Sequence, residues 1–442
     1  MKRRLLIAAI ATAFASQAAA EDLLQVYRDA RAYDAQYSAA RYALQAGIEK
    51  LPQGLAGVLP TLNLTGYGTR ANYDVEPRSG NTSSAYSRSI SNANYTFTLT
   101  QPVYRAQNKI TWDQGEYQVK QAEALFSVAT QDLILRVAQA YFDVLSAQDT
   151  LALTRAQKEA ISEQLAQAKR NFEVGTATIT DTHEAQARFD LSSAQEITAL
   201  NDLEVKRRNL AQITGKNYEV LKPLKPEIKL SPPAPAKMES WVELATKQSF
   251  SVLAQEAVAE IAQLEAKKQR AGHYPTLDLV ASYGLTGQTG STITALGTNT
   301  TASSLQLQVA VPLYAGGVIY SRERETAALA MKARDDLENV RRTSALTSQQ
   351  SYLGVINGIA QVRALEAALV SSQSALDSNK LGYEVGVRIN IDVLNAQQQL
   401  FSTRRDLAVA RYNTITNFLK LKAAVGGLAE PDLEEYNKAL AP

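Results

Sequence analysis

The pattern of apolar and polar positions runs through the same order twice along the chain. A helical period, over about 21–55 in the first copy and about 240–271 in the second, is followed by two short segments of strict alternation. A long helical period comes next, turns at a Val-Gly pair and returns as a shorter one. Apolar residues that recur every three or four positions predict helices, whereas alternation predicts strands with one apolar face. The chain is therefore predicted to be a duplication of one helix–strand–strand–long helix–helix unit.

The breaks in this pattern define the expected parts of the chain. Lys2, Arg3 and Arg4 precede an apolar run and three alanines, which predicts a secretory signal peptide. Five prolines mark a linker between the two repeats. The expected boundaries are 1–20 for the signal peptide, 21–215 for the first repeat, 216–237 for the linker, 238–426 for the second repeat and 427–442 for a polar C-terminal tail.

Alternation is clearest where apolar side chains share one face of a segment. Tyr95, Phe97 and Leu99 lie on one face of such a segment, and Asn94 and Thr96 lie on the other. The stretch from 69 to 88 is rich in Ser, Asn and Tyr, which predicts a loop between the first two strands. The four strands are expected near 61–68, 92–101, 276–284 and 304–311.

The two longest helical periods exceed what a compact globular domain needs. Long helical hairpins are expected at 105–213 and 317–425, and 105–173 contains no Pro and one Gly. At ~1.5 Å per residue each long helix would extend on the order of 100 Å. Two neighbouring seams of apolar and small residues, one through Leu133 and Val137 and one through Leu135, predict helices on both sides.

Each predicted hairpin turns at matching residues. The matching pairs are Val174-Gly175 with Val385-Gly386 and Asp181 with Asp392, at a single offset (386 − 175 = 392 − 181 = 211). A Gly after a helical run supplies the left-handed residue that ends a helix, and a carboxylate favours the first turn of the next helix. The exposed tips are therefore expected at Val174, Gly175, Thr176, Val385, Gly386 and Val387.

Four strands are too few to form a membrane barrel from one chain, since bacterial barrels begin at about eight strands. An open strand edge in lipid leaves backbone groups without hydrogen bonds, at a cost of several kcal/mol each. The chain is therefore expected to oligomerise, and three copies would give twelve strands and six helical hairpins. The fold class is then an α+β membrane protein whose homotrimer forms a 12-stranded β-barrel continued by a long α-helical barrel. Tyr95, Phe97, Leu305 and Leu307 would then face the lipid of the outer membrane. A soluble α+β protein is the alternative, although it does not require two such long helices.

Composition and motifs narrow the possible functions. The chain has 46 basic and 44 acidic residues and no Cys, which argues against nucleic-acid binding and thiolate metal sites. No catalytic motif stands out, and His183 and His273 are interpreted as structural. Neither an enzyme, a cofactor, a metal nor a membrane-spanning helix beyond residue 20 is expected.

The duplicated plan and both Val-Gly tips resemble the TolC family of outer-membrane exit ducts. The resemblance covers essentially the whole mature chain and includes three local matches, Val311 to Gly317, Gly382 to Leu394 and Ala408 to Asn413. It implies a trimeric channel that extends from the outer membrane into the periplasm. It also implies docking of the tips on a periplasmic adaptor and an inner-membrane transporter, and passive export of drugs or secreted proteins.

The resemblance further implies a gate at the periplasmic entrance, formed by Asp181, Tyr383 and Arg388. Such a set makes charge-assisted hydrogen bonds that one conformation satisfies and another breaks. The resemblance also places a cation-selective ring at Asp392, but Asn395 replaces a second Asp of the ring, so weaker cation selectivity is expected. Two simpler interpretations stay open, namely helix capping for the aspartates and ordinary packing for Tyr383.

Other classes of function compete with the duct. A helical structural or adhesive stalk at the cell surface would explain the long helices but not the two amphipathic strand pairs. A secreted helical enzyme lacks a catalytic motif. The sequence does not choose between drugs and proteins as cargo, because a passive duct leaves that choice to its partners.

Overall fold

The computed structural model describes residues 21–76, 85–225, 228 and 230–441, so the predicted signal peptide lies outside the described residues. The described chain forms two compact units. The sheet unit consists of the described parts of Leu44–Glu123 and Ala254–Glu338. The helical unit consists of the described parts of Met1–Ala43, Ala124–Leu253 and Asn339–Pro442.

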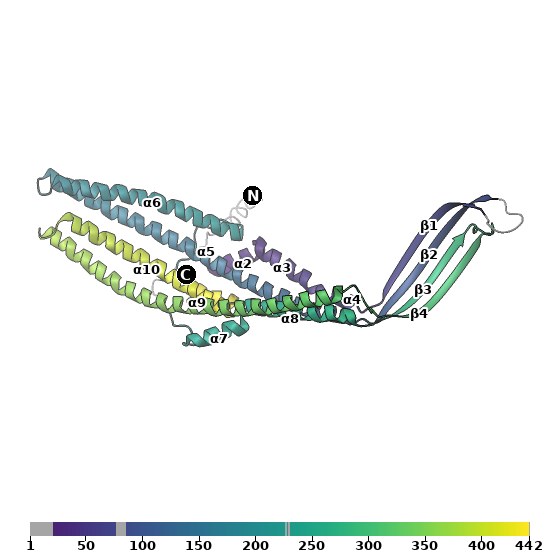
Figure 1. Ribbon diagram of the computed structural model, residues 1–442. Coiled ribbons are helices and arrows are strands. Elements are labelled where there is room, and N and C mark those ends of the chain that lie inside the picture. The colour runs from purple at the N-terminus through teal and green to yellow at the C-terminus, as the bar shows by residue number, and fades with distance from the viewer. Residues whose placement is uncertain (1–20, 77–84, 226–227, 229, 442) are drawn as a thin grey trace, which may run out of the picture. The chain divides into compact units, whose positions relative to one another are not determined.

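Four antiparallel strands form the sheet, in the order β1-β2-β3-β4 (Figure 1). The strands are β1 (Thr61–Val75), β2 (Tyr86–Tyr104), β3 (Thr276–Gln288) and β4 (Thr298–Ala310). The central pair joins the two repeats, because Tyr95 of β2 lies opposite Leu285 of β3. The duplicated strand pairs therefore form one continuous sheet.

The strands are longer than the sequence analysis predicted. The loop predicted over 69–88 is wrong in its described parts, because β1 continues to Val75 and β2 begins at Tyr86. Arg70 and Asn72 of this extension pair with Ser91 and Ser89. Ala71 and Tyr73 alternate with these polar residues, so the loop prediction was wrong because it depended on composition alone.

The predicted two-faced character of the strands is confirmed. Tyr95, Phe97 and Leu99 are exposed on one face of β2. The alternate residues are half-buried and bonded to one another, since Asn94 Nδ2 donates to Thr286 Oγ1 at 2.7 Å. One face of the sheet is thus apolar and the other is polar and hydrogen-bonded.

Both outer strands of the sheet keep one open edge. Within the described residues, β1 pairs only with β2, and β4 pairs only with β3. An unpaired edge exposes a row of backbone donors and acceptors that can pair with another chain.

A bidentate ion pair connects the end of β2 to β3. Arg105 follows β2 and donates to the two carboxylate oxygens of Asp278 at 2.8 and 2.7 Å. Asp278 lies on β3 and is 7% exposed. The pair thereby ties the residue that precedes the first long helix to the sheet.

The chain contains the two predicted long hairpins, and the parts of them from Ala124 and from Asn339 onward lie in the helical unit. The hairpins are α5 (Ala106–Glu173) with α6 (Ile179–Thr214), and α9 (Val318–Glu384) with α10 (Asn390–Ala424). The observed ends lie within about two residues of the predicted ones, because Gly and Pro mark them clearly in the sequence. The turns of both hairpins lie at the same end of the helical unit (Figure 1).

The core of the helical unit includes both seams of the first long helix. Leu133, Val137 and Phe142 of α5 are fully or almost fully buried. They share one cluster with Leu210 of α6 and Leu419 of α10. The two hairpins therefore share a core, and the predicted presence of neighbours on two sides of α5 is confirmed.

Two helices that the sequence predicted as continuous are interrupted. The predicted helix over 21–55 forms three helices, α2 (Leu23–Tyr33), α3 (Ala35–Ile48) and α4 (Lys50–Ala56). The predicted helix over 240–271 forms α7 (Met238–Gln248), α8 (Phe250–Arg270) and a short 3-10 turn (Ala271–His273).

The break between α2 and α3 occurs at Asp34. Its carboxylate accepts a hydrogen bond of 2.6 Å from the backbone amide of Tyr37 and caps the start of α3. The same carboxylate accepts two hydrogen bonds from Arg136, at 2.9 and 3.1 Å.

The polar tail forms a helix that the sequence analysis did not predict, α11 (Glu430–Lys438). Its Leu433 is fully buried in the core of the helical unit. Asp432 forms an ion pair with Lys422 of α10 at 2.6 Å, and Leu440 pairs with Leu224 of the linker. The tail therefore packs against the body of the helical unit.

Helix α9 contains an 18-residue window apolar enough, with a mean hydropathy of 1.4, to pass a test for membrane spans. By length and composition alone, this helix contradicts the expectation that no membrane-spanning helix follows residue 20. The helix is 67 residues long, although a span needs about 20. Only 17% of the window is buried within the chain, and Val355 and Ile359 of α9 are buried against Leu421 of its hairpin partner α10.

Candidate functional site at the hairpin tips

The two tips are built from the same backbone geometry. Gly175 and Gly386 have φ angles of 77° and 80°, in the left-handed region that favours glycine. In the first tip the carbonyl of Asn171 accepts from the amides of Thr176 and Ala177 at 2.8 and 3.2 Å. In the second, the carbonyl of Gly382 accepts from Val387 and Arg388 at 2.9 and 3.0 Å. These residues differ by the offset of 211, so the repeat extends to single hydrogen bonds.

The tips present apolar side chains to solvent. Val174, Val385 and Val387 are 72%, 65% and 75% exposed. In this structure the six predicted tip residues are therefore accessible.

Asp181 caps the helix that follows the first tip. Its carboxylate accepts from the backbone amide and the hydroxyl of Thr178 at 2.9 and 2.8 Å, and Thr178 Oγ1 accepts from the Asp181 amide at 3.3 Å. This reciprocal capping box satisfies two backbone donors of α6. Within one chain, Asp181 therefore acts as a helix cap.

Asp392 occupies the equivalent position of α10 but has a different partner. The residue before α10 is Ile389, which has no side-chain oxygen to complete a capping box. The carboxylate of Asp392 lies 3.6 Å from the guanidinium of Arg388 instead. The exposed Arg388 thus forms a pair within its own tip, of a kind that stabilises by about 0–1 kcal/mol.

Tyr383 links the second hairpin to the first. Its ring packs with the cluster of Leu376, Val393 and Leu400 in the α9–α10 hairpin. Its hydroxyl accepts a hydrogen bond of 3.2 Å from the Asn171 side chain, at the end of α5. Tyr383 therefore has both a packing role and a contact between hairpins.

The structure of one chain does not bring the predicted gate residues together. Among its described contacts, Asp181 bonds to Thr178, Tyr383 to Asn171, and Arg388 to Asp392. Sequence reasoning missed Asn171. Its place next to Tyr383 in the 211-residue repeat (171 + 211 = 382) was a signal that could have identified it. The assignment of Asp181, Tyr383 and Arg388 to a gate stays a prediction.

Above the tips, α10 packs on the first hairpin through a small apolar cluster. Leu394 of α10 contacts a group of buried residues from α5 and α6, among them Leu165 and Ala185. Asn390 lies near this cluster, is 1% exposed, and neither polar atom of its side chain has a partner among the described residues. A buried amide without hydrogen bonds costs about 1–3 kcal/mol.

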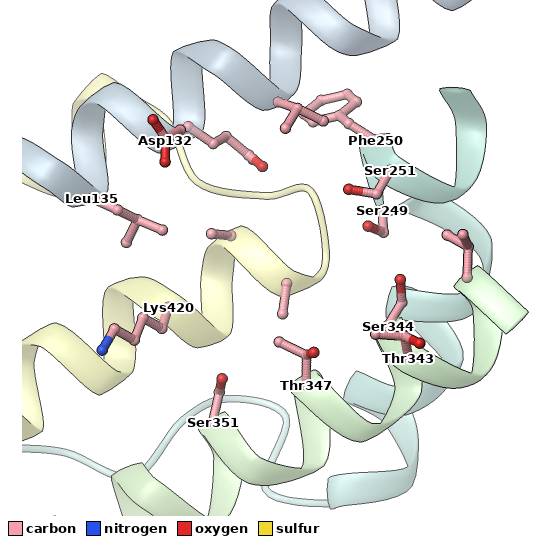
Figure 2. Close-up of a pocket in the computed structure, with 15 residues that line it drawn as sticks. Asp132, Leu135, Ser249, Phe250, Ser251, Thr343, Ser344, Thr347, Ser351 and Lys420 are labelled. Carbon is pink, nitrogen blue, oxygen red and sulfur yellow. The ribbon is translucent and has the colours of Figure 1, made fainter. Parts of the chain in front are cut away.

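A cavity of about 540 Å³ lies beside the helices, away from the tips (Figure 2). Asp132 and Leu135 of α5 line one side, and hydroxyls such as those of Ser344 and Thr347 come from α9. Asp132 is already bonded to Arg136 at 2.7 Å. Within the described residues no group of three or more His, Asp or Glu could hold a metal ion. The cavity presents no arrangement of groups that points to a reaction.

Comparisons with known proteins support this description. A family profile described as "Outer membrane efflux protein" matches residues 52–216 and 241–427. The outer membrane protein TolC of Escherichia coli strain K12 is 34% identical over 449 residues, covering 99% of this chain and 88% of the relative. The alkaline protease secretion protein AprF of Pseudomonas aeruginosa is 31% identical over 414 residues, covering 93% and 86%.

Solved structures give the same fold. The outer membrane protein VceC of Vibrio cholerae superposes with a TM-score of 0.79 at 17% identity, covering 92% of this chain and 96% of that one. Sheet, duplicated hairpins and paired tips together define an outer-membrane channel with a long helical body. The chain belongs to the outer membrane efflux protein family.

Membership confirms the fold, the outer-membrane location and the channel function expected from the resemblance. The interpretation as a stalk without transport is not favoured. The named relatives are outer membrane, efflux and secretion proteins rather than enzymes.

Proposed function

We propose that three copies of the chain form a passive duct, with a 12-stranded barrel in the outer membrane and a helical tunnel in the periplasm. The observation that carries this proposal is the sheet with one apolar face and two open edges. In lipid those edges need partners, and pairing β1 of one copy with β4 of the next would close the barrel. The exposed Tyr95, Phe97, Leu305 and Leu307 would face lipid, and the polar face would line water.

The mass of the detergent-extracted particle tests the assembly. Light scattering corrected for bound detergent should give three times the mass of the mature chain. A detergent-free monomer would overturn the duct. Single-channel recording in planar bilayers then tests conduction, since a trimer that forms no channel would support a stalk.

Transport energy would come from an inner-membrane transporter, reached through a periplasmic adaptor that contacts the tips. The exposed valines of both tips support this docking surface. Val174→Asp and Val385→Asp should abolish export in cells without lowering conductance of the purified trimer, because the charge prevents burial of the tips. Val309→Ala, an exposed residue of β4, is a control for surface changes elsewhere. Wild-type export by both tip variants would contradict the docking surface.

At the periplasmic end, Asp181, Tyr383 and Arg388 would form the gate and Asp392 an anionic ring. In one chain Asp181 and Arg388 have local partners only, and both are partly or largely exposed. A neighbouring copy could therefore reach them without displacing a buried contact.

Both drugs and proteins are proposed as cargo, because the matching family is described as an efflux protein and one similar relative is the secretion protein AprF. A deletion strain tests this when antibiotic tolerance and the profile of secreted proteins are measured side by side. Loss of only one trait would restrict the cargo to that class.

A further inference from the structure

Arg188 joins the two hairpins above the tips. It lies on α6, and its Nη1 donates to Gln398 Oε1 at 2.6 Å while Nη2 donates to Asn395 Oδ1 at 2.9 Å. Both acceptors belong to α10, and Arg188 lies next to Phe189, which packs on the cluster around Leu394. The planar guanidinium thus bridges two positions almost one helical turn apart.

Both acceptors of Arg188 are neutral. Glu184 lies one turn earlier on the same helix, at a spacing that commonly gives an ion pair, yet no ion pair to Arg188 is found in the described part of the chain. The guanidinium therefore keeps its positive charge without a carboxylate partner. A charged donor still makes a stronger hydrogen bond than a neutral one.

The bridge lies one turn beyond the predicted anionic ring. Asn395 follows Asp392 by three residues on α10, so both project to one side of that helix. Asp392 is already paired with Arg388. The helix of Arg188, α6, also carries the acidic residues Asp181 and Glu184, whereas a second cation, Lys158 of α5, lies over the ring of Phe189 at 5.6 Å and pairs with Glu196 at 3.0 Å. Arg188 differs from Lys158 and Arg388 because its two hydrogen bonds go to neutral acceptors, so its charge is not offset by them.

We propose that Arg188 is a clamp that holds the two hairpins together and lowers the cation preference of the entrance. This inference rests on the proposed function as a gated duct. Moving α10 away from α6 breaks both hydrogen bonds at once, so the clamp stabilises the closed arrangement. In a trimer three such cations lie near the entrance, where rings of charge determine which ions pass.

Two measurements distinguish the role of Arg188 in holding the hairpins together from the effect of its charge on ion preference. Conductance reports how readily the hairpins separate, and the reversal potential under a salt gradient reports ion preference. Arg188→Gln removes both properties, so conductance should rise several-fold and the reversal potential should shift toward cations. Arg188→Lys keeps the charge but loses the fork geometry, so conductance should rise while the reversal potential stays.

Asn395→Asp should give the reverse of the result expected for Arg188→Lys. It converts the neutral bridge into an ion pair, so conductance should not rise, while the added carboxylates shift the reversal potential toward cations. A matched control is Arg404→Gln, because Arg404 also donates to a neutral amide, that of Gln373 at 3.1 Å, but within the second hairpin alone. It should leave conductance unchanged.

The experiment uses purified full-length trimers in planar bilayers, after each variant is shown to be trimeric in detergent. If Arg188→Gln had the conductance and reversal potential of the wild type, the inference would be overturned. If Arg388→Ser still raised the conductance in that case, the proposed gate would be kept without the clamp. A rise in conductance without a shift in potential would overturn the selectivity role and leave the clamp. A wild-type protein without channel activity would overturn the proposed function and this inference with it.

Discussion

The side chain of Asn171 donates a hydrogen bond of 3.2 Å to the hydroxyl of Tyr383 and thereby links the end of α5 to the end of α9. Both residues lie within four positions of a tip glycine, so the bond joins the two tips themselves. A part-buried hydrogen bond of this kind stabilises by about 0.5–1.5 kcal/mol. Three of them in a trimer would favour the closed entrance.

Removal of this bond should open the channel. Tyr383→Phe keeps the ring in its apolar cluster and removes only the acceptor, so we expect a higher single-channel conductance. Asn171→Ala should have the same effect, and the double variant should not exceed the larger single effect, because both changes remove one interaction. Additive effects, or unchanged conductance in both variants, would show that the bond does not hold the gate.

Arg388→Ser should raise both conductance and cation preference. The substitution removes the cation that lies 3.6 Å from Asp392, so the carboxylate is left to attract cations. Asp392→Asn is the matched opposite and should lower cation preference. Reversal potentials measured under a salt gradient distinguish the two, and equal values in both variants would exclude a ring at Asp392.

Asp34 should stabilise the helical unit at neutral pH and lose this effect in acid. Hydrogen bonds from Arg136 lower the pKa of its carboxyl below the usual range, although burial opposes them. Since the folded pKa is lowered, the stabilisation is present above the unfolded pKa and is lost as pH falls through the folded one. Asp34→Ala should cost about 1–3 kcal/mol near pH 7, seen as a lower Tm in detergent.

Asp132→Asn is the control for this change, because the more exposed Asp132 bonds to the same arginine. It should lower the Tm less than Asp34→Ala at pH 7. An equal Tm for Asp34→Ala and wild type at that pH would contradict the role assigned to Asp34.

Asp149 should have the opposite pH dependence. Burial raises the pKa of its carboxyl, and the hydrogen bond of 2.6 Å from the Tyr412 hydroxyl only partly opposes this. A raised folded pKa gives stabilisation that is present below the unfolded pKa and is lost as pH rises through the folded one. Asp149→Asn keeps an acceptor for Tyr412 but carries no charge, so its Tm should equal or exceed that of wild type at pH 7.

The difference between Asp149→Asn and wild type should shrink as the pH falls through the raised pKa of the wild-type carboxyl, because that carboxyl then becomes neutral. Tyr412→Phe should lower the Tm at pH 7, because it leaves the buried carboxylate without its donor. A Tm of Asp149→Asn well below wild type at pH 7 would show that the charge itself stabilises the core.

Periodicity predicted most of the fold, because each long helix buries continuous seams and each hairpin ends at a glycine. It failed in several places, and two of them have a clear cause. The outer ends of β1 and β2 have a polar composition typical of loops, although Ala71 and Tyr73 still alternate with polar residues, and the break at Asp34 depends on a carboxylate that serves as cap and ion-pair partner at once. Neither feature has a Gly, a Pro or a change of period to mark it.

The site was less predictable than the fold. The offset of 211 residues located Asp181 and Asp392 correctly at the starts of two helices, but their different partners depend on Thr178 and Ile389 in front of them. The contact of Arg188 with Asn395 joins positions 207 residues apart. It depends on the packing of α6 against α10, about which spacing within one helix carries no information.

The open edges of β1 and β4 have a consequence for biogenesis. A sheet that gains its last backbone partners only from other copies cannot enter the bilayer one chain at a time without exposing those edges to lipid. Newly exported subunits must therefore find each other before or during insertion. A subunit with a defective strand edge would assemble with wild-type subunits and prevent the barrel from closing. Such alleles should be genetically dominant over the wild-type gene, unlike alleles that remove the chain altogether.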